Sequence, residues 1–173
     1  RLRGKVAYIT GGAGGIGSAT AAAMAREGAR IAVVDIDADG AESVASTLRR
    51  GGTEAIALAA DVSDEAAVRD SVERLVAEFG RLDIMHLNAA TGFPEDTDIV
   101  DTDAVIWEKL FRVNVMSVVY GVKYGVPRMI EGGGGNIVIT SSAGSLAGDH
   151  NRAAYGSLKA TVTALARYLS VSH

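Results

Sequence analysis

Thr10-Gly11-Gly12-Ala13-Gly14-Gly15-Ile16-Gly17 is the stretch that decides the fold of this chain. It follows the short apolar run from Val6 to Thr10, which is typical of a buried strand, and a helix is expected to begin near Gly15. Glycines at such a turn let the backbone approach a pyrophosphate, because no Cβ stands in the way. The first turn of the helix then offers free N–H groups and a positive dipole end to the phosphates. The stretch therefore predicts a dinucleotide site.

Strand-like apolar runs alternate with helical patterns along the rest of the chain. One helical stretch carries Val68, Val72 and Leu75 at helical spacing, with Asp64 as its expected N-cap and Gly80 as its stop. This alternation predicts parallel strands joined by right-handed crossovers and covered by helices on both faces. The expected fold class is α/β, a doubly wound parallel sheet (Rossmann fold) in three layers, with residues 1–173 as one domain. The expected strands are residues 6–10, 30–35, 54–60, 84–88 and 136–140.

The composition narrows the class of protein. Hydrophobic residues make up 48% of the 173 residues, which is enough for one domain with a sizeable core. The net charge of -4 disfavours a nucleic-acid partner, and the lack of cysteine excludes disulfides and thiolate metal sites. No apolar run reaches the roughly 18 residues of a membrane helix. We expect a soluble cytoplasmic protein without a metal site.

An acidic residue ends the second expected strand. Asp35 lies 18 residues beyond Gly17, where a carboxylate can accept hydrogen bonds from both ribose hydroxyls of an adenosine. The same carboxylate repels a 2′-phosphate, and Ile36 rather than a basic residue follows it. The pattern favours NAD over NADP. The alternative is that Asp35 only caps the turn into the helix near Ala41.

A group suited to proton transfer follows the fifth expected strand. Tyr155 opens a helix, and Lys159 lies one turn further on the same side. A cation near a phenol favours the phenolate and lowers the pKa of the phenol, which suits a general acid–base group. Ser142 ends the fifth strand region, where a hydroxyl can hold a substrate oxygen. A Tyr–Lys pair alone is usually a surface pair, but the glycine turn upstream favours the chemical interpretation.

Asn114 is a polar residue in an apolar helical stripe with Trp107, Leu110, Phe111 and Val118. A buried amide without partners costs roughly 1–3 kcal/mol, so its side chain must be satisfied. One interpretation is a local bond to the helix backbone. The other is that Asn114 anchors a water near Lys159 and extends a proton path.

Three other features have simpler interpretations. Residues 91–101 are polar and carry Gly92 and Pro94, which predicts a loop. The glycine run 132–135 precedes a strand, so it is interpreted as a flexible turn away from the ligand side rather than as a phosphate cradle. His86 lies in an expected strand and is interpreted as structural.

Together these residues resemble the short-chain dehydrogenase/reductase family over the whole chain. Ala90 stands where the family's N-A-G element has its glycine, which narrows the space near the cofactor ribose. The matches are Thr10, Gly11, Gly15 and Gly17 for the T-G-x-x-x-G-x-G motif, Asp35 for the NAD-type acid, Asp61 and Val62 for the adenine contact, and Asn88 and Ala89 for N-A-G. The resemblance implies that these residues, with Ile16, Tyr155 and Lys159, bind NAD.

The catalytic tetrad of that family matches Asn114, Ser142, Tyr155 and Lys159. The resemblance implies an oxidoreductase that transfers a hydride between NAD(H) and an alcohol or carbonyl substrate, with Tyr155 as general acid–base. Lys159 is then expected to bind the nicotinamide ribose, Ser142 to orient the substrate and Asn114 to hold the relay water. Family members continue with further strand–helix units, which implies a domain that is incomplete at its C-terminus.

Two other functions are weighed against this one. The first is a non-catalytic NAD-binding sensor, which the intact Ser142, Tyr155 and Lys159 disfavour because a sensor needs no proton path. The second is an epimerase or dehydratase of the related extended type, whose glycine spacing differs. The substrate is expected to be a small molecule in contact with Ala143, Gly144, Leu146, Asp149 and His150. His150 either binds a polar substrate group or is a solvated loop residue.

Association of copies is expected through the helical stretches at residues 103–130 and 153–170. Both carry apolar residues beyond the stripe that one sheet can cover, and such surface usually meets another subunit. The family resemblance implies a homotetramer or homodimer. The apolar residues in question are Val113, Val115, Val119 and Tyr120 on the first stretch and Val171 near the second.

Overall fold

Five parallel strands form the central sheet of the computed structural model, which describes residues 1–148 and 151–172. The strand order is β3-β2-β1-β4-β5, so the chain builds one half of the sheet outward from β1 and then returns to build the other half. Ligands of doubly wound sheets bind at this reversal, beyond the carboxyl ends of β1 and β4. The strands are β1 (Val6–Thr10), β2 (Arg30–Asp35), β3 (Ala55–Ala59), β4 (Ile84–Leu87) and β5 (Asn136–Ile139).

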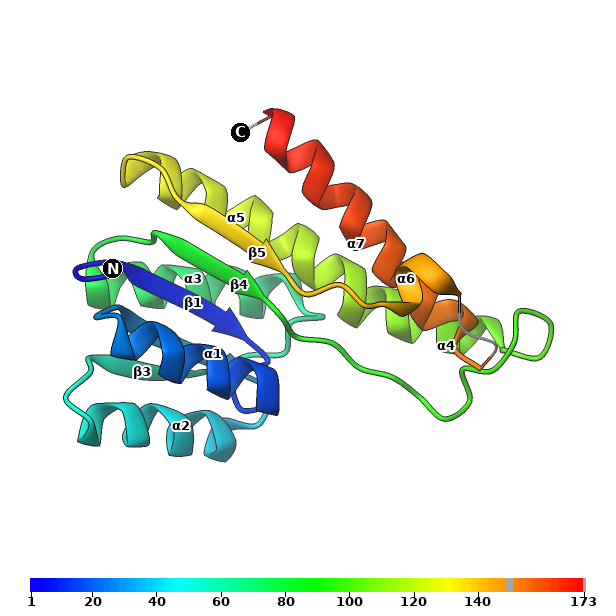
Figure 1. The fold of residues 1–173 in the computed structure, drawn as a ribbon, viewed down its shortest axis with the longest axis horizontal. Coiled ribbons are helices and arrows are strands. Elements are labelled where there is room, and N and C mark those ends of the chain that lie inside the picture. The colour runs from blue at the N-terminus through cyan, green and yellow to red at the C-terminus, as the bar shows by residue number, and fades with distance from the viewer. Residues whose placement is uncertain (149–150, 173) are drawn as a thin grey trace.

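Helices cover both faces of this sheet, which gives the three layers expected from the sequence (Figure 1). The last of them is the long helix that carries the Tyr–Lys pair. The helices are α1 (Gly15–Arg26), α2 (Ala38–Arg50), α3 (Glu65–Phe79), α4 (Ala104–Phe111), α5 (Ser117–Glu131), α6 (Gly144–Ala147) and α7 (Ala153–Ser172), with the π-helical turn η1 (Arg112–Met116) between α4 and α5.

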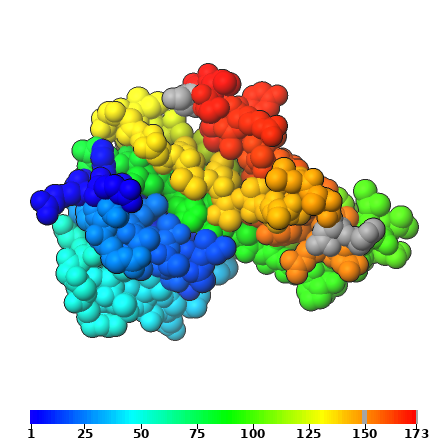
Figure 2. Space-filling view, in the orientation of Figure 1, coloured from blue at the N-terminus to red at the C-terminus, as the bar shows by residue number. Residues whose placement is uncertain are grey.

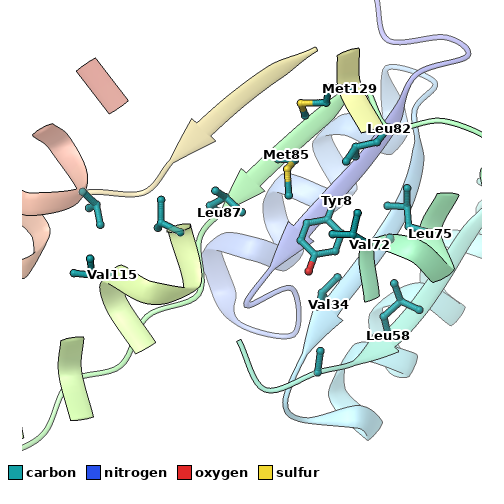
Figure 3. Close-up of a cluster of buried hydrophobic side chains, with 14 of the residues drawn as sticks. Tyr8, Val34, Leu58, Val72, Leu75, Leu82, Met85, Leu87, Val115 and Met129 are labelled. Carbon is teal, nitrogen blue, oxygen red and sulfur yellow. The ribbon is translucent and has the colours of Figure 1, made fainter. Parts of the chain in front are cut away.

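The core consists of two layers because the strands bury side chains on both faces. Alanines of α1 and α2 pack on one face, whereas α3, α5 and α7 pack on the other. Figure 3 shows Tyr8, Val34 and Met85 on this second face. The Tyr8 hydroxyl lies 2.7 Å from the Ser71 hydroxyl of α3, so the polar end of this buried ring is satisfied.

Most expected boundaries are confirmed to within a residue. The strands at 6–10 and 30–35 match, and the other three are each shorter than expected by one or two residues. Asp64 caps α3 by accepting a hydrogen bond from the Ala66 N–H at 2.8 Å, and Gly80 ends it with a φ of 76°. The glycine run is a turn into β5, in which Gly133 and Gly134 have positive φ. These local signals are strong because a side-chain acceptor satisfies the first N–H groups of a helix, and because glycine adopts positive φ without strain.

The helical stretch at residues 103–130 differs from the prediction of a single regular helix. The π-helical turn η1 interrupts it at the residues around Asn114. Such a turn contains an extra residue and rotates the side chains that follow it. Val115, which lies inside this turn, is 3% exposed and belongs to the core, so its assignment to an unpartnered apolar surface is wrong. Val113, Val119 and Tyr120 are half-buried, and Val171 is exposed.

The described residues contain no helix that is both long enough and apolar enough to span a membrane.

Candidate active site

The glycine turn after β1 needs glycine at two positions for its own packing, and at a third position glycine leaves the surface of the turn open. Gly11 has a φ of 63°, and a Cβ there would lie 3.0 Å from the Ala89 Cα. A Cβ on Gly17 would collide with the Gly11 carbonyl oxygen, so Gly17 lets α1 pack against the turn. A Cβ on Gly15, by contrast, would meet no protein atom within 4 Å and would project into open space. Gly15 therefore keeps a surface of the turn open for a ligand.

The N-terminus of α1 lies at this opening. Its N-cap residue is Gly14, which provides no side-chain hydrogen bond, and its first turn has no acidic residue. Ile16 in that turn is 63% exposed. The first N–H groups of α1 and its dipole are thus left for an anion, as the sequence predicts. The residues present fit a dinucleotide pyrophosphate.

Asp35 ends β2 beside the same turn. Its carboxylate accepts hydrogen bonds from the Ala13 N–H at 2.9 Å and from the Asp37 N–H at 3.0 Å. Asp35 therefore does cap the turn into α2, whereas the N-cap of the helix itself is Asp37, which accepts from the Gly40 N–H at 3.0 Å. Ile36 is 71% exposed beside it. Asp35 thus fixes the glycine turn and still lines the cavity that the turn opens into.

Asn88 ties β4 and β5 to the glycine turn. Its amide nitrogen donates to the carbonyls of Thr10 at 3.1 Å and Gly11 at 3.4 Å, and its amide oxygen accepts from the Thr140 hydroxyl at 3.1 Å. The Ala89 N–H donates to the Thr10 hydroxyl at 3.1 Å. Because the Asn88 amide is already bound at both ends, its side chain shapes the site and leaves the backbone nearby to face a ligand.

Tyr155 and Lys159 lie together on α7, as their spacing predicts. The Lys159 ammonium lies 5.8 Å from the centre of the Tyr155 ring and donates to the Thr140 carbonyl at 2.8 Å. Lys159 is only 2% exposed, and burial lowers its pKa. An ammonium group has three donors, so a bond to one carbonyl leaves donors for further acceptors. The pair forms a cationic, half-enclosed end of the site.

Asn114 and Ser142 lie beside the site and do not line its cavity. Asn114 is 1% exposed; its amide oxygen accepts from the Thr91 N–H at 2.8 Å, and its amide nitrogen donates to the Thr91 carbonyl at 2.9 Å. Its partner is therefore the segment after β4, and the interpretation of a bond to its own helix backbone is wrong. The Ser142 hydroxyl accepts from the Gly144 N–H at 3.2 Å. Neither residue lines the cavity between the glycine turn and the Tyr–Lys pair.

A cavity of about 780 Å³ joins the two ends of the site. Its volume is in the range of small-molecule and cofactor sites. Ala90, at the position of the family's glycine, also faces it. At one end it is lined by Gly11, Gly15, Ile16, Asp35, Asp61 and Val62, in the middle by Asn88 and Ala89, and at the other end by Thr140, Tyr155 and Lys159.

Several residues of the site could not be identified from the sequence. Phe93 and Val113 add apolar surface to the cavity, and Thr140 supplies the carbonyl that holds Lys159. The only signal in the sequence for these three residues is that each lies within a few residues of a recognised motif. Among the expected substrate contacts, Leu146 on α6 is 83% exposed, and Asp149 and His150 lie outside the described residues.

Comparison with known proteins agrees with this geometry. Secoisolariciresinol dehydrogenase of Forsythia intermedia is 37% identical over 99% of this chain and 61% of its own length. The crystal structure of levodione reductase superposes with a TM-score of 0.95, is 32% identical, and is matched over 100% of this chain and 67% of that one. NAD+-bound xylitol dehydrogenase has a TM-score of 0.93 at 31% identity, with 99% of this chain and 65% of that chain covered.

The chain spans about three fifths of the length of the first of these relatives. The family model for short chain dehydrogenases matches residues 5–173, which include the glycine turn, the sheet and the Tyr–Lys pair. This protein is therefore a member of the short-chain dehydrogenase/reductase family.

Proposed function

We propose that the protein is an NAD-dependent oxidoreductase that interconverts an alcohol and the corresponding carbonyl compound. The observation that carries this proposal is the single cavity that runs from the glycine turn and Asp35 to Tyr155 and Lys159. A nucleotide site alone would serve many functions. Its continuity with a half-buried phenol and a buried ammonium group is what favours hydride transfer coupled to proton transfer.

The nucleotide end favours NAD over NADP. The carboxylates of Asp35, Asp37 and Asp61 all line this end of the cavity, and they would repel the additional negative charge of a 2′-phosphate bound there. Among the described residues that line the cavity, the only cation is Lys159, at the opposite end. A solved relative in the same family carries NAD+. These observations support a ribose with a free 2′-hydroxyl.

The chemical end supplies proton transfer and orientation. A bound nicotinamide would supply the hydride chemistry, because its oxidised ring would accept the hydride of the carbinol carbon in the oxidation direction. Tyr155 is the general acid–base group that would take up the hydroxyl proton, and the Lys159 ammonium lies 5.8 Å from the centre of its ring. The Ser142 hydroxyl, which lies beside the cavity and not in its lining, is proposed to hold the substrate oxygen. Asn114 fixes the segment after β4 through Thr91, and its relay-water role remains a prediction.

The proposed partner is a small alcohol or ketone. A suitable panel takes its members from the relatives: secoisolariciresinol and xylitol with NAD+, and levodione with NADH. The measurement is the change in NADH absorbance, repeated with the NADP(H) pair. We expect turnover of at least one member of this chemical class with the NAD pair. Binding of NAD without turnover of any member would contradict the proposal and favour a non-catalytic NAD-binding sensor.

A further inference from the structure

The segment between β4 and α4, residues 91–103, holds the start of the helix that carries Tyr155. Figures 1 and 2 show it projecting beyond the sheet beside α6 and the start of α7. The Asp96 carboxylate accepts hydrogen bonds from the Ala154 N–H at 2.9 Å and from the Tyr155 N–H at 2.8 Å. The Thr97 carbonyl accepts from the Ala153 N–H at 3.0 Å. Three successive N–H groups of α7 are thus bound by two neighbouring residues from far upstream in the chain.

We propose that Asp96 is a positioning residue, which fixes the Tyr155 phenol relative to Lys159 and the substrate. The inference rests on the proposed function, because it assigns to Asp96 a role in the turnover that Tyr155 performs. Asp96 acts only through the backbone of α7 and does not line the cavity. Its carboxylate nevertheless binds the N–H of Tyr155 itself.

The need for a carboxylate follows from the start of α7. Arg152 precedes the helix, and a guanidinium has no acceptor for the first N–H groups. A carboxylate offers two oxygens and a negative charge at the positive end of the helix dipole. Asp96 is 3% exposed, so water cannot readily replace it. The first turn of α7 is therefore ordered by a residue from another element.

The same segment is anchored to the fold at one further point and is braced by a hydrogen bond within itself. Thr91 is bound by the side chain of Asn114 from η1, and the Thr97 N–H donates to the Thr102 hydroxyl at 2.9 Å. These bonds connect the start of the segment to η1 and hold the turn that follows Asp96. Asp96 thus transmits the position of β4 and η1 to the backbone of Tyr155. A misplacement of about 1 Å at a catalytic group can cost roughly 10²-fold in rate.

Asp98 provides a matched control on the same segment. Its carboxylate also accepts two backbone N–H groups, those of Val100 at 2.8 Å and Asp101 at 2.9 Å, but Asp98 is exposed and its bonds stay within its own turn. Asp98→Asn makes the same replacement of a carboxylate by an amide, but it affects only the turn of Asp98 itself. Val162→Ala is a second control, because Val162 is fully buried on α7 and its truncation lowers stability without affecting the first turn.

The experiment compares Asp96→Asn with wild type, both controls and Tyr155→Phe. The amide introduced by Asp96→Asn would point an NH₂ group at one of the two N–H groups, so one bond is lost with little change in volume. We expect kcat for the best alcohol of the panel to fall at least about tenfold, with the Kd of NAD+ within about twofold of wild type. Amide exchange at residues 153–155 should accelerate at least about tenfold. Asp98→Asn should change none of these three quantities: kcat, the Kd of NAD+ and the amide exchange at residues 153–155.

The outcomes separate this inference from the proposed function. If Tyr155→Phe is inactive and Asp96→Asn keeps more than half of the wild-type kcat, Asp96 has no positioning role. If Val162→Ala loses as much kcat as Asp96→Asn at an equal loss of melting temperature, the effect is general destabilisation and the inference is overturned. If Tyr155→Phe retains its turnover, the proposed function fails instead. Unchanged exchange at residues 153–155 in Asp96→Asn overturns the inference whatever the turnover.

Discussion

Asp35 combines two tasks at the scale of single residues: it holds the glycine turn through the Ala13 N–H, and it lines the cavity. We predict that wild type prefers NAD over NADP by at least about tenfold, or roughly 1.4 kcal/mol, because a 2′-phosphate would meet this carboxylate. The double substitution Asp35→Ser with Ile36→Arg should shift the preference toward NADP. The arginine can pair with the phosphate, and the serine no longer repels it. Steady-state kinetics with both cofactors measures the shift.

Asp39→Ser is the control for this prediction. Asp39 lies in the first turn of α2 and does not line the cavity, so its loss removes a nearby negative charge without changing the site. It should leave the preference within about twofold of wild type. Equal use of NAD and NADP by wild type would show that Asp35 does not select the cofactor.

His86 on β4 is a buried histidine whose tautomer follows from the hydrogen bonds of its neighbours. Its Nε2 lies 2.9 Å from the Thr140 hydroxyl, whose own hydrogen is donated to Asn88. Nε2 therefore carries the hydrogen, and Nδ1 is buried without a partner among the described residues. Burial lowers the pKa of His86 below 6.5. The interpretation of His86 as structural agrees with these contacts.

This lowered pKa predicts a pH dependence of stability. Between pH 6.5 and the lower folded-state pKa, the unfolded chain binds a proton at His86 and the folded protein does not. The free energy of unfolding therefore falls as the pH falls through this window, by about 1.4 kcal/mol for each pH unit that the window spans. His86→Gln keeps a donor for Thr140 and does not titrate. Urea unfolding at about pH 8 and about pH 5 measures the free energy of unfolding. Between these two pH values it should fall more for wild type than for His86→Gln. An equal fall in the free energy of unfolding for wild type and His86→Gln would contradict the prediction.

At the scale of elements, the sheet and most helices can be predicted because their signals are local. Buried parallel strands appear as short apolar runs, and Asp64 and Gly80 mark the ends of α3 through hydrogen bonding and positive φ. The glycine turn and the Tyr–Lys pair are also local, since each is a short continuous stretch of sequence. The sequence alone therefore places these elements correctly.

The elements that could not be predicted depend on contacts distant in sequence. A π-helical turn changes the apolar period by one residue, which periodicity over the 103–130 stretch cannot resolve, and the expected face of Val115 is therefore wrong. The 91–103 segment contains several acidic residues of similar character. Only the fold distinguishes Asp96, which binds α7 58 residues later, from Asp98, which binds its own turn. The partner of Asn114 escapes prediction for the same reason, because Thr91 lies on another element.

At the scale of the whole molecule, exposed apolar side chains remain on the helices after α3. Phe111 is 42% exposed on α4, and Tyr168 and Val171 are 74% and 83% exposed on α7. With the half-buried Val113 and Val119, they support the prediction that copies associate as a homotetramer or homodimer. Light scattering of the complete protein at micromolar concentration should give a mass above that of a monomer. A monomer under those conditions would rule out this association.

We propose that one cavity binds NAD at the glycine turn and that Tyr155, at the other end of that cavity, moves a proton. Tyr155→Phe tests it most directly, because the ring is kept and only the hydroxyl is removed. We predict a Kd for NAD+ within about threefold of wild type. Turnover of the best alcohol should fall by roughly 10²–10⁴-fold, the usual contribution of a general acid–base group. A variant that binds NAD+ and keeps more than about a third of wild-type turnover would contradict the account.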